Sequence, residues 1–330
     1  MKLLSIIVPA YNVANYIEEC LGSLTEEESI NDALDIIVIN DGSTDNTLDL
    51  IKPFEKKYSN CLRLIDKENA GHGSGINRGI LEAKGKYLKV LDSDDWVISE
   101  NLKKLVKYIE TTKEEPDIII NDYEQIWEND NTKALHSLTN IIPGKIQGLV
   151  FLNKSGYRFT IHSLTIKTEL YQNNVKQKID EKTSYDDVQY VLYPVPYISQ
   201  FVYLDFVVYQ YRMGGSTQSV NFENMQKNRN KLRNILINAW EYYSSTQREM
   251  NSDQQRYYLQ DMGYSVGDYL NLLFTIDDVG LAKTEFVKFV KETHFPTKHI
   301  KNNKARIVIY TKGLLFGQVS RWYRRKMTKR

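Results

Sequence analysis

Three carboxylate side chains, those of Asp92, Asp94 and Asp95, lie within four residues, directly after an apolar run with the pattern of a buried strand. Closely spaced carboxylates repel one another and are costly to remove from water, so a positive charge is expected among them. Mg²⁺ or Mn²⁺ prefers hard oxygen ligands of this kind and would in turn hold a diphosphate. The alternative is that Asp95 or Ser99 caps the helix expected over 99–110, while the other acids are solvated. The cluster alone does not decide between these interpretations.

The residues that would position this cluster alternate between short apolar runs and amphipathic segments. This pattern predicts strands over 3–9, 34–40, 62–66 and 87–91, and helices over 15–24, 44–58, 74–83 and 99–110. In the first helix, Asn15 is expected as the N-cap, with Glu18 at the third helical position. Continuous apolar strands separated by helices indicate an α/β fold with a mostly parallel sheet covered on both faces.

Polar segments follow four of the predicted strands, at residues 9–12, 41–43, 69–78 and 92–95. Because the carboxyl ends of parallel strands share one edge of the sheet, their convergence favours a binding site there. Pro9 lacks a backbone donor and Tyr11 offers an aromatic face, so this segment could hold a flat base by stacking. Asp41 could accept a hydrogen bond from such a base, or could cap the following helix.

The segment 69–79 is rich in glycine and lies between a predicted strand and a predicted helix. The spacing of its glycines does not match a dinucleotide-binding fingerprint. A glycine-rich helix start with Arg78 on its first turns still suits a phosphate. His72 could contact a donor phosphate or sugar, or could be a polar loop residue without a ligand.

Further along the chain, strands are expected over 117–121 and 201–211, whereas 123–160 is irregular and polar. From residue 221 onward apolar residues recur at helical spacing, and helices are expected over 253–275 and 280–293. We interpret the first of these apolar stripes as packing core: Met225, Leu232, Ile235, Leu236, Ala239, Trp240 and Tyr243. The expected organisation is therefore a ligand-binding domain over 1–220 and a helical region over 221–330.

Two adjacent acids, Asp186 and Asp187, precede an apolar stretch. One carboxylate held beside an acceptor hydroxyl could serve as a general base. The alternative is a helix N-terminus, where acids are favoured by the helix dipole.

Together these motifs resemble the family 2 glycosyltransferases, nucleotide-sugar-dependent enzymes of bacteria with the GT-A fold. The resemblance covers roughly residues 3–215. Five segments carry it, in this order: 5–12, 38–47, 68–79, 85–96 and 185–188. Each segment is a weak signal alone, but their combination in this order and spacing is specific.

The resemblance implies roles for individual residues. The residues around uracil would be Pro9, Ala10, Tyr11 and Asp41, with Asn69 and Arg78 near the nucleotide and its phosphates. Asp92 would contact the ribose, Asp94 would bind the metal, Asp95 is a candidate for touching the donor sugar, and Ser93 would belong to the nucleotide-sugar site. Asp187 would be the catalytic base, with Asp186 in place of the glutamate that the family usually shows. Segment 212–219 is similar to the family's mobile loop, in which Arg212 and Ser216 would close on the diphosphate.

The activity that the resemblance implies is a metal-dependent, inverting transfer of a sugar from a UDP-sugar to a hydroxyl of a glycan, glycolipid or teichoic-acid-like acceptor. The cofactor would be Mn²⁺ or Mg²⁺. The alternative is a non-catalytic UDP-sugar-binding or scaffolding partner of a polysaccharide-synthesis complex. Intact Asp94 and Asp187 argue against it. A nucleotidyltransferase would also use carboxylates and metal, but would leave Asp187 unexplained.

The C-terminal segment 306–330 holds eight basic residues and no acid, interleaved with apolar and aromatic residues. This composition suits a helix on an anionic membrane surface; the alternative is a helix packed on the protein with a solvated basic end. Because the whole chain has a net charge of only +1, no nucleic-acid partner is expected.

Only two cysteines occur, Cys20 and Cys61, so a disulfide framework is not expected and a reducing compartment is favoured. The apolar run that begins the chain is short and ends at Pro9, which favours a buried strand over a signal peptide. No run approaches the roughly 18 apolar residues that span a bilayer. We expect a cytoplasmic protein that is peripheral at the inner face of the cell membrane.

Overall fold

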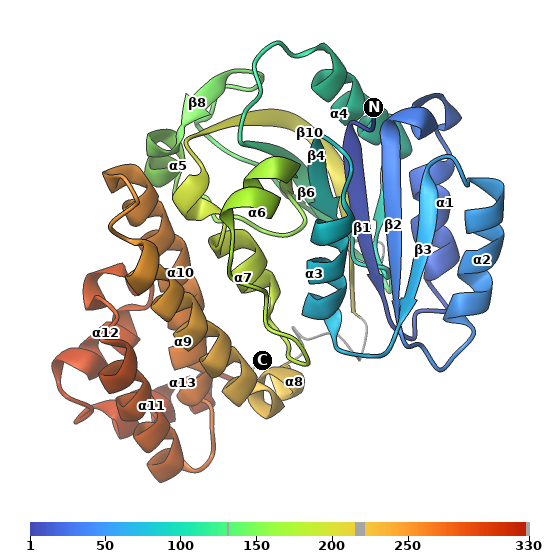
Figure 1. The fold of residues 1–330 in the computed structure, drawn as a ribbon. Helices are drawn as coiled ribbons and strands as arrows, with labels where there is room; N and C mark the ends of the chain where they lie inside the picture. Colours follow the sequence, from blue (N-terminus) through green and yellow to red (C-terminus); the bar gives the residue numbers. More distant parts are fainter. Residues whose placement is uncertain (131, 215–221, 328–330) are drawn as a thin grey trace. The chain divides into compact units, whose positions relative to one another are not determined.

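The computed structural model describes residues 1–130, 132–214 and 222–327. The chain divides into two compact units, Met1–Gly215 and Ser216–Arg330. Among the described residues, the strands all belong to the first unit, and the second unit consists of helices and their connections (Figure 1).

Four parallel strands form one side of the sheet, in the order β3-β2-β1-β4. They are β1 (Leu4–Ala10), β2 (Leu34–Asp41), β3 (Leu62–Lys67) and β4 (Tyr87–Val90). Every residue of β1, β2 and β4 is buried. This burial explains why these strands are continuous apolar runs and not alternating ones.

Helices cover both faces of these strands (Figure 1). The helix α1 (Ile17–Thr25) buries Cys20 in the same cluster as Ile6, on the face that it shares with α2 (Thr47–Lys57). The helix α3 (His72–Glu82) brings Gly79 against Ile7. Since successive residues of a strand point to opposite faces, α1 and α3 lie on opposite sides of β1.

The rest of the sheet is mixed. The long strands β6 (Ile118–Trp127) and β10 (Gln200–Met213) pair in parallel, whereas β9 (Leu164–Lys167) joins β4 to β6 antiparallel to both. The short β5 (Trp96–Val97) pairs with β10 at the edge, between the carboxylate cluster and α4 (Ser99–Thr111). The predicted α/β fold is confirmed, with a mixed sheet. The strands expected over 117–121 and 201–211 correspond to the start of β6 and to most of β10.

The segment 123–160, expected to be irregular, is not. It holds the end of β6, the strands β7 (Thr132–His136) and β8 (Ile146–Gly148), and the helix α5 (Leu149–Ser155). Both strands are short additions outside the main strand order, and β7 is largely exposed. An exposed edge strand needs no apolar run, so the pattern gave no signal for it.

Several predicted helix starts were wrong by a few residues. The first helix begins at Ile17 with Tyr16 as its N-cap, so Asn15 does not cap it. The helix α2 begins at Thr47, whose N–H donates to Asp45, and Asp41 therefore does not cap it.

The helices of the second unit are α8 (Phe222–Lys227), α9 (Arg229–Thr246), α10 (Ser252–Leu273), α11 (Val279–Thr293), α12 (Asn303–Tyr310) and α13 (Phe316–Met327). The predicted apolar stripe of α9 forms packing core, with Ile235, Leu236 and Ala239 fully buried. Among the described helices, none combines the length and the apolar character that crossing a membrane requires.

The C-terminal helix α13 packs on its own unit. The ring of Phe316 lies 5.1 Å from that of Phe274, and the hydroxyl of Ser320 donates to the carbonyl of Phe274. Large side chains of the segment 306–327 are nevertheless exposed, among them Tyr310, Leu314 and Trp322. The basic residues Lys329 and Arg330 lie outside the described residues.

Candidate active site

The carboxylate cluster forms a turn after β4, in which the N–H of Asp95 donates to the carbonyl of Asp92. Burial alternates along the turn: Asp92 and Asp94 are partly exposed, whereas Ser93 and Asp95 are buried. Asp92 and Asp94 therefore face the surface of the site, whereas Ser93 and Asp95 face the protein interior.

Asp95 anchors this turn to β10. Its carboxylate accepts a hydrogen bond from the hydroxyl of Tyr209 at 2.5 Å and one from the N–H of Arg212 at 2.7 Å. Burial, with the charges of Asp94 and Asp92, raises the pKa of Asp95 well above its usual value. Both of its oxygens are thus occupied by β10, which leaves little capacity for a donor sugar.

The capping interpretation of the cluster is wrong. The helix α4 has Ile98 as its N-cap and no side-chain cap. The hydroxyl of Ser99 donates to the carbonyl of Ser23 and to Glu26, and Asp95 is occupied by β10.

Asp94 is the acid of the cluster to which no side chain of the described residues donates a hydrogen bond. Burial and the neighbouring charge of Asp92 raise the pKa of Asp94. A cation beside it would offset both effects, because an opposite charge favours the ionised form.

His162 was missed by the sequence reasoning. One nitrogen of its ring and one oxygen each of Asp92 and Asp95 all lie within 4.8 Å of one another. The ring packs against Tyr123, Tyr209 and Tyr211, and burial lowers the pKa of His162 to about 4, so the imidazole is neutral. Its Nδ1 has no hydrogen-bond partner among the described residues.

Carboxylates with a neutral imidazole are a donor set that suits a divalent cation such as Mn²⁺. These residues fit a divalent cation, with His162 as an added candidate ligand. Asp94, which the resemblance implies as the metal ligand, is not among the three residues whose ligand atoms lie within 4.8 Å of one another, so its role stays a prediction. No spacing signal could have found His162, because it lies alone in a polar segment.

Lys89 holds the segment that carries His162. Its ammonium group, almost fully buried, donates to the carbonyls of His162 at 2.7 Å and Leu164 at 3.2 Å. Burial lowers the pKa of Lys89 to about 7. The sequence did contain a signal for this contact, because a lysine in the middle of an apolar strand requires a hydrogen-bond or charged partner.

His72 joins the cluster to the second acidic motif. Its Nε2 lies 3.0 Å from Asp92, and its Nδ1 lies 2.8 Å from Asp186. Burial alone would lower the pKa of His72, but the two carboxylates raise it well above its usual value. His72 is the first residue of α3, so it is not a loop residue; whether it contacts a donor phosphate or sugar stays a prediction.

Asp187 follows directly, as the first residue of α7 (Asp187–Leu192), and it is exposed to solvent. Partial desolvation by the surrounding protein, with the charges of Asp186 and Asp92, raises the pKa of Asp187 to about 6. A carboxylate with such a pKa is still largely ionised at neutral pH and is well matched to accept a proton.

The strand end at β1 presents an aromatic ring. Pro9 and Ala10 are buried in the strand, whereas Tyr11 is 49% exposed. Asn12 has a positive φ of 53°, and its side-chain oxygen accepts from the N–H of Thr44 at 2.8 Å. The turn is thus held in place while the ring of Tyr11 remains free to stack.

Asp41 holds the glycine-rich loop. Its carboxylate, 2% exposed, accepts from the N–H groups of Ala70 at 3.0 Å and Gly71 at 2.7 Å, and it also pairs with Lys67. Asn69, in the same loop, is exposed.

The glycines of this segment are explained by close packing. A Cβ on Gly75 would lie 2.9 Å from the Cβ of Pro9, and Gly71 has a φ of 90°. Glycine is needed at both positions, because any side chain would collide with the strand or strain the loop.

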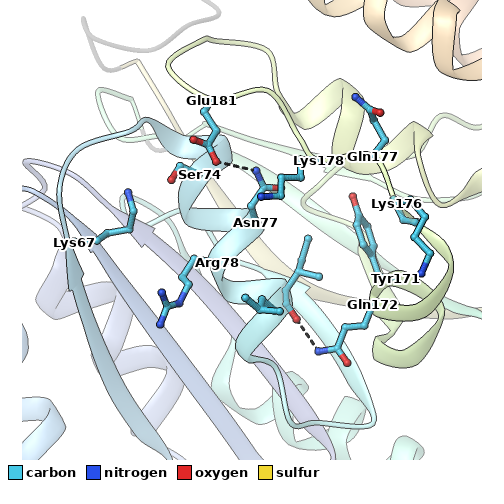
Figure 2. A pocket seen from close by; sticks show the side chains of 13 residues that line it. Lys67, Ser74, Asn77, Arg78, Tyr171, Gln172, Lys176, Gln177, Lys178 and Glu181 are labelled. Atoms are coloured by element: carbon cyan, nitrogen blue, oxygen red, sulfur yellow. Dashed lines mark hydrogen bonds between the residues drawn. The ribbon is translucent and has the colours of Figure 1, made fainter.

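Arg78 lies on the outer face of α3, in a pocket of about 570 Å³ (Figure 2). Its guanidinium group pairs with Glu82 at 2.8 Å. Lys67, which binds Asp41, lines the same pocket. The pocket is therefore linked to the end of β2 through the Lys67–Asp41 pair.

Arg212 was expected at the beginning of a mobile loop, but it lies within β10 and is only 6% exposed. Its Nε donates to the carbonyl of Asp94 at 2.7 Å, and its guanidinium group pairs with Glu19 and Glu128. The arginine therefore fixes the back of the carboxylate turn. Ser216 lies outside the described residues.

Comparison with known proteins identifies the family. Residues 5–171, half of the chain, match the model of glycosyl transferase family 2, and the chain belongs to this family. The resemblance drawn from the motifs is thereby confirmed, and the protein is a glycosyltransferase by family.

Two relatives illustrate the extent of the similarity. The chondroitin synthase of Pasteurella multocida is 26% identical over 334 residues, which cover 96% of this chain and 31% of that protein. Glycosyltransferase GlyA of Streptococcus pneumoniae is 34% identical over 135 residues, covering 41% of this chain and 19% of that protein. The chain thus spans less than half the length of these relatives.

Solved structures agree on the GT-A fold. Residues 1–349 of TarS from S. aureus, in complex with UDP-GlcNAc, superpose with a TM-score of 0.67 at 19% identity, covering 99% of this chain and 92% of that one. A mannosyltransferase from Pyrobaculum calidifontis, in complex with GDP-Man and Mn²⁺, superposes with a TM-score of 0.50 at 13% identity, covering 97% and 86%.

Proposed function

We propose that this chain transfers a sugar from a UDP-sugar to a hydroxyl group of a glycan, glycolipid or teichoic-acid-like acceptor, with inversion at the anomeric carbon. The observation that carries the proposal is the hydrogen-bonded chain Asp92–His72–Asp186, which brings the carboxylate turn beside the candidate base Asp187. A single displacement requires the sugar donor and the general base to lie in one site.

The donor is proposed to lie along the carboxyl ends of β1, β2 and β4. The exposed ring of Tyr11 offers a stacking surface for uracil, beside the loop that Asp41 holds. Asp92 is proposed to contact the ribose, as the family resemblance implies; its side chain is partly exposed. The UDP-GlcNAc in the TarS complex supports a UDP-sugar as the donor class.

A divalent cation, Mn²⁺ or Mg²⁺, is proposed to be held by Asp94, as the family resemblance implies. Asp92 and His162, which the structure groups with Asp95, are further candidate ligands. Asp95 is the weakest candidate, because Tyr209 and Arg212 occupy its oxygens. When bound, the cation supplies positive charge that stabilises the leaving diphosphate.

Asp187 is proposed as the general base. Its carboxylate would take the proton of the acceptor hydroxyl while the oxygen attacks the anomeric carbon, opposite the bond to the leaving UDP. A pKa of about 6 keeps this carboxylate largely ionised at neutral pH, yet basic enough to accept a proton in the transition state.

The C-terminal segment is proposed to rest on an anionic membrane surface. Tyr310, Leu314 and Trp322 are exposed apolar and aromatic side chains of this segment, and its basic residues Arg321 and Lys326 are exposed as well. Basic residues with interfacial aromatics favour such a surface. The packing of Phe316 keeps the helix folded without a membrane.

The decisive experiment measures UDP release by the wild-type chain with a panel of UDP-sugars, Mn²⁺ and candidate acceptors. We expect acceptor-dependent release with one donor, and loss of at least 100-fold in kcat for Asp187→Asn with UDP affinity retained. UDP binding without any release would instead favour the non-catalytic alternative. Near wild-type turnover by Asp187→Asn would refute the base assignment.

A further inference from the structure

One side chain, that of His72, contacts both acidic motifs of the site. Nε2 faces Oδ1 of Asp92 at 3.0 Å, and Nδ1 faces Oδ2 of Asp186 at 2.8 Å. The side chain of His72 is 34% exposed, so it borders the site and is not a closed core residue. Asp186 by contrast is only 5% exposed.

The backbone around His72 is fastened to the segment that leads to Asp187. The N–H of Lys182 donates to the carbonyl of Ala70 at 2.8 Å. Asn77 and Ile179 exchange two hydrogen bonds, at 2.8 and 3.1 Å. Contacts on both sides of His72 therefore hold the start of α3 and residues 179–182 together.

Gly73 makes this close approach possible. A Cβ at Gly73 would lie 3.0 Å from Oδ2 of Asp186 and even closer to the carbonyl of Asp180. The backbone at the start of α3 therefore lies directly against the segment that contains Asp180 and Asp186. The ring of His72 extends from there to Asp92.

We propose that His72 is a positioning residue. It holds Asp187, the candidate base, at a fixed distance from the part of the site that binds the donor. Its Nδ1 arm fixes Asp186, and thereby the backbone from which Asp187 projects. Its Nε2 arm fixes Asp92 in the carboxylate turn. This inference rests on the proposed function, because the two ends have meaning only if a donor and an acceptor meet between them.

The two arms can be separated by two amide variants. The side-chain nitrogen of asparagine occupies the place of Nδ1, and that of glutamine the place of Nε2. His72→Asn therefore keeps the bond to Asp186 and loses that to Asp92, whereas His72→Gln does the reverse. A hydrogen bond to a charged group is worth about 1.5–3 kcal/mol, which corresponds to at least about tenfold in a rate or affinity.

The test compares kcat, donor KM and UDP affinity of both variants in the presence of Mn²⁺. We expect His72→Gln to lower kcat about tenfold with UDP affinity retained, and His72→Asn to weaken UDP binding and raise donor KM about tenfold with kcat less affected. His294→Asn, at an exposed residue with a φ of 48° at the end of α11, is the matched control and should leave all three unchanged.

Equal losses in both variants, following a common fall in Tm, would mean a purely structural role and overturn the inference. Wild-type values in both would overturn it as well. The proposed function fails separately, if the wild-type chain releases no UDP with any donor; the difference in UDP affinity between the two variants then still tests the Asp92 arm.

Discussion

The hydroxyl of Tyr209 donates a hydrogen bond of 2.5 Å to the carboxylate of Asp95, a residue 114 positions earlier in the chain. The same hydroxyl accepts from the N–H of Asp92 at 3.2 Å. One phenol therefore fixes both ends of the carboxylate turn, and the outward direction of Asp92 and Asp94 depends on it.

Tyr209→Phe is expected to lower the free energy of unfolding by about 1–3 kcal/mol, because one oxygen of a buried carboxylate loses its donor while the other still accepts from the N–H of Arg212. Urea denaturation measures this change. Tyr310→Phe is the control, since Tyr310 is 67% exposed and its hydroxyl should contribute little. Equal urea midpoints for the wild type and Tyr209→Phe would show that the turn is held by other contacts.

The rate of transfer should depend on pH through Asp187. Because the base acts as a carboxylate and the pKa of Asp187 is raised to about 6, kcat should fall about tenfold per pH unit below that value. The profile is measured at saturating donor and acceptor. A flat kcat between pH 7 and pH 5 would contradict the assignment.

The carboxylate of Asp187 should also lower the free energy of unfolding at neutral pH. The folded-state pKa of about 6 exceeds the ordinary value of 3.8, so the folded chain binds the proton more tightly than the unfolded chain does. The destabilisation is full above pH 6 and is relieved as the pH falls through 6 towards 3.8. Asp187→Asn should therefore raise Tm relative to the wild type at pH 7.5, and by less at pH 5; the reverse order would falsify the sign of this shift.

Removal of the cation should abolish transfer. We expect loss of turnover in EDTA, recovery with added Mn²⁺, and a rise of Tm with Mn²⁺ that Asp94→Ala removes and His162→Ala diminishes. Asp49→Ala is the control, because Asp49 is an exposed acid paired only with Lys52 among the recorded ion pairs of the described residues. Full turnover in EDTA would remove the metal from the mechanism.

Charge reversal in the C-terminal segment should weaken membrane binding. Arg321→Glu with Lys326→Glu is expected to lower binding to vesicles containing anionic lipid by about tenfold or more, since each basic residue near such a surface contributes about 1 kcal/mol. Co-sedimentation measures this, with neutral vesicles for comparison. Lys288→Glu with Lys291→Glu makes the same charge change on α11 and should have less effect; equal partitioning of all variants would end the membrane proposal.

Much of this protein follows from local sequence. The strands β1, β2, β3 and β4 were predicted within a residue or two, because the buried β1, β2 and β4 are mainly apolar and the partly buried β3 still carries Leu62, Leu64 and Ile65. The carboxylates, Tyr11 and Asp187 could be predicted as site residues because polar residues at strand ends and in acidic pairs have local signatures. The exposed strand β7 was missed because it has none.

What the tertiary structure decided is how the acids divide their roles. Asp95 was expected near the sugar, but Tyr209 and Arg212 bind it from β10; Arg212 was expected in a mobile loop, but it is buried behind the turn. His72 and His162 gained their significance only through Asp186, Asp92 and Asp95, which lie far from at least one of them in sequence. The sequence alone determined which residue types reach the edge of the sheet, because burial and chain direction are local properties. Which of them meet is decided by strand order and loop packing, because hydrogen bonds and charges act across distances in space and not along the chain.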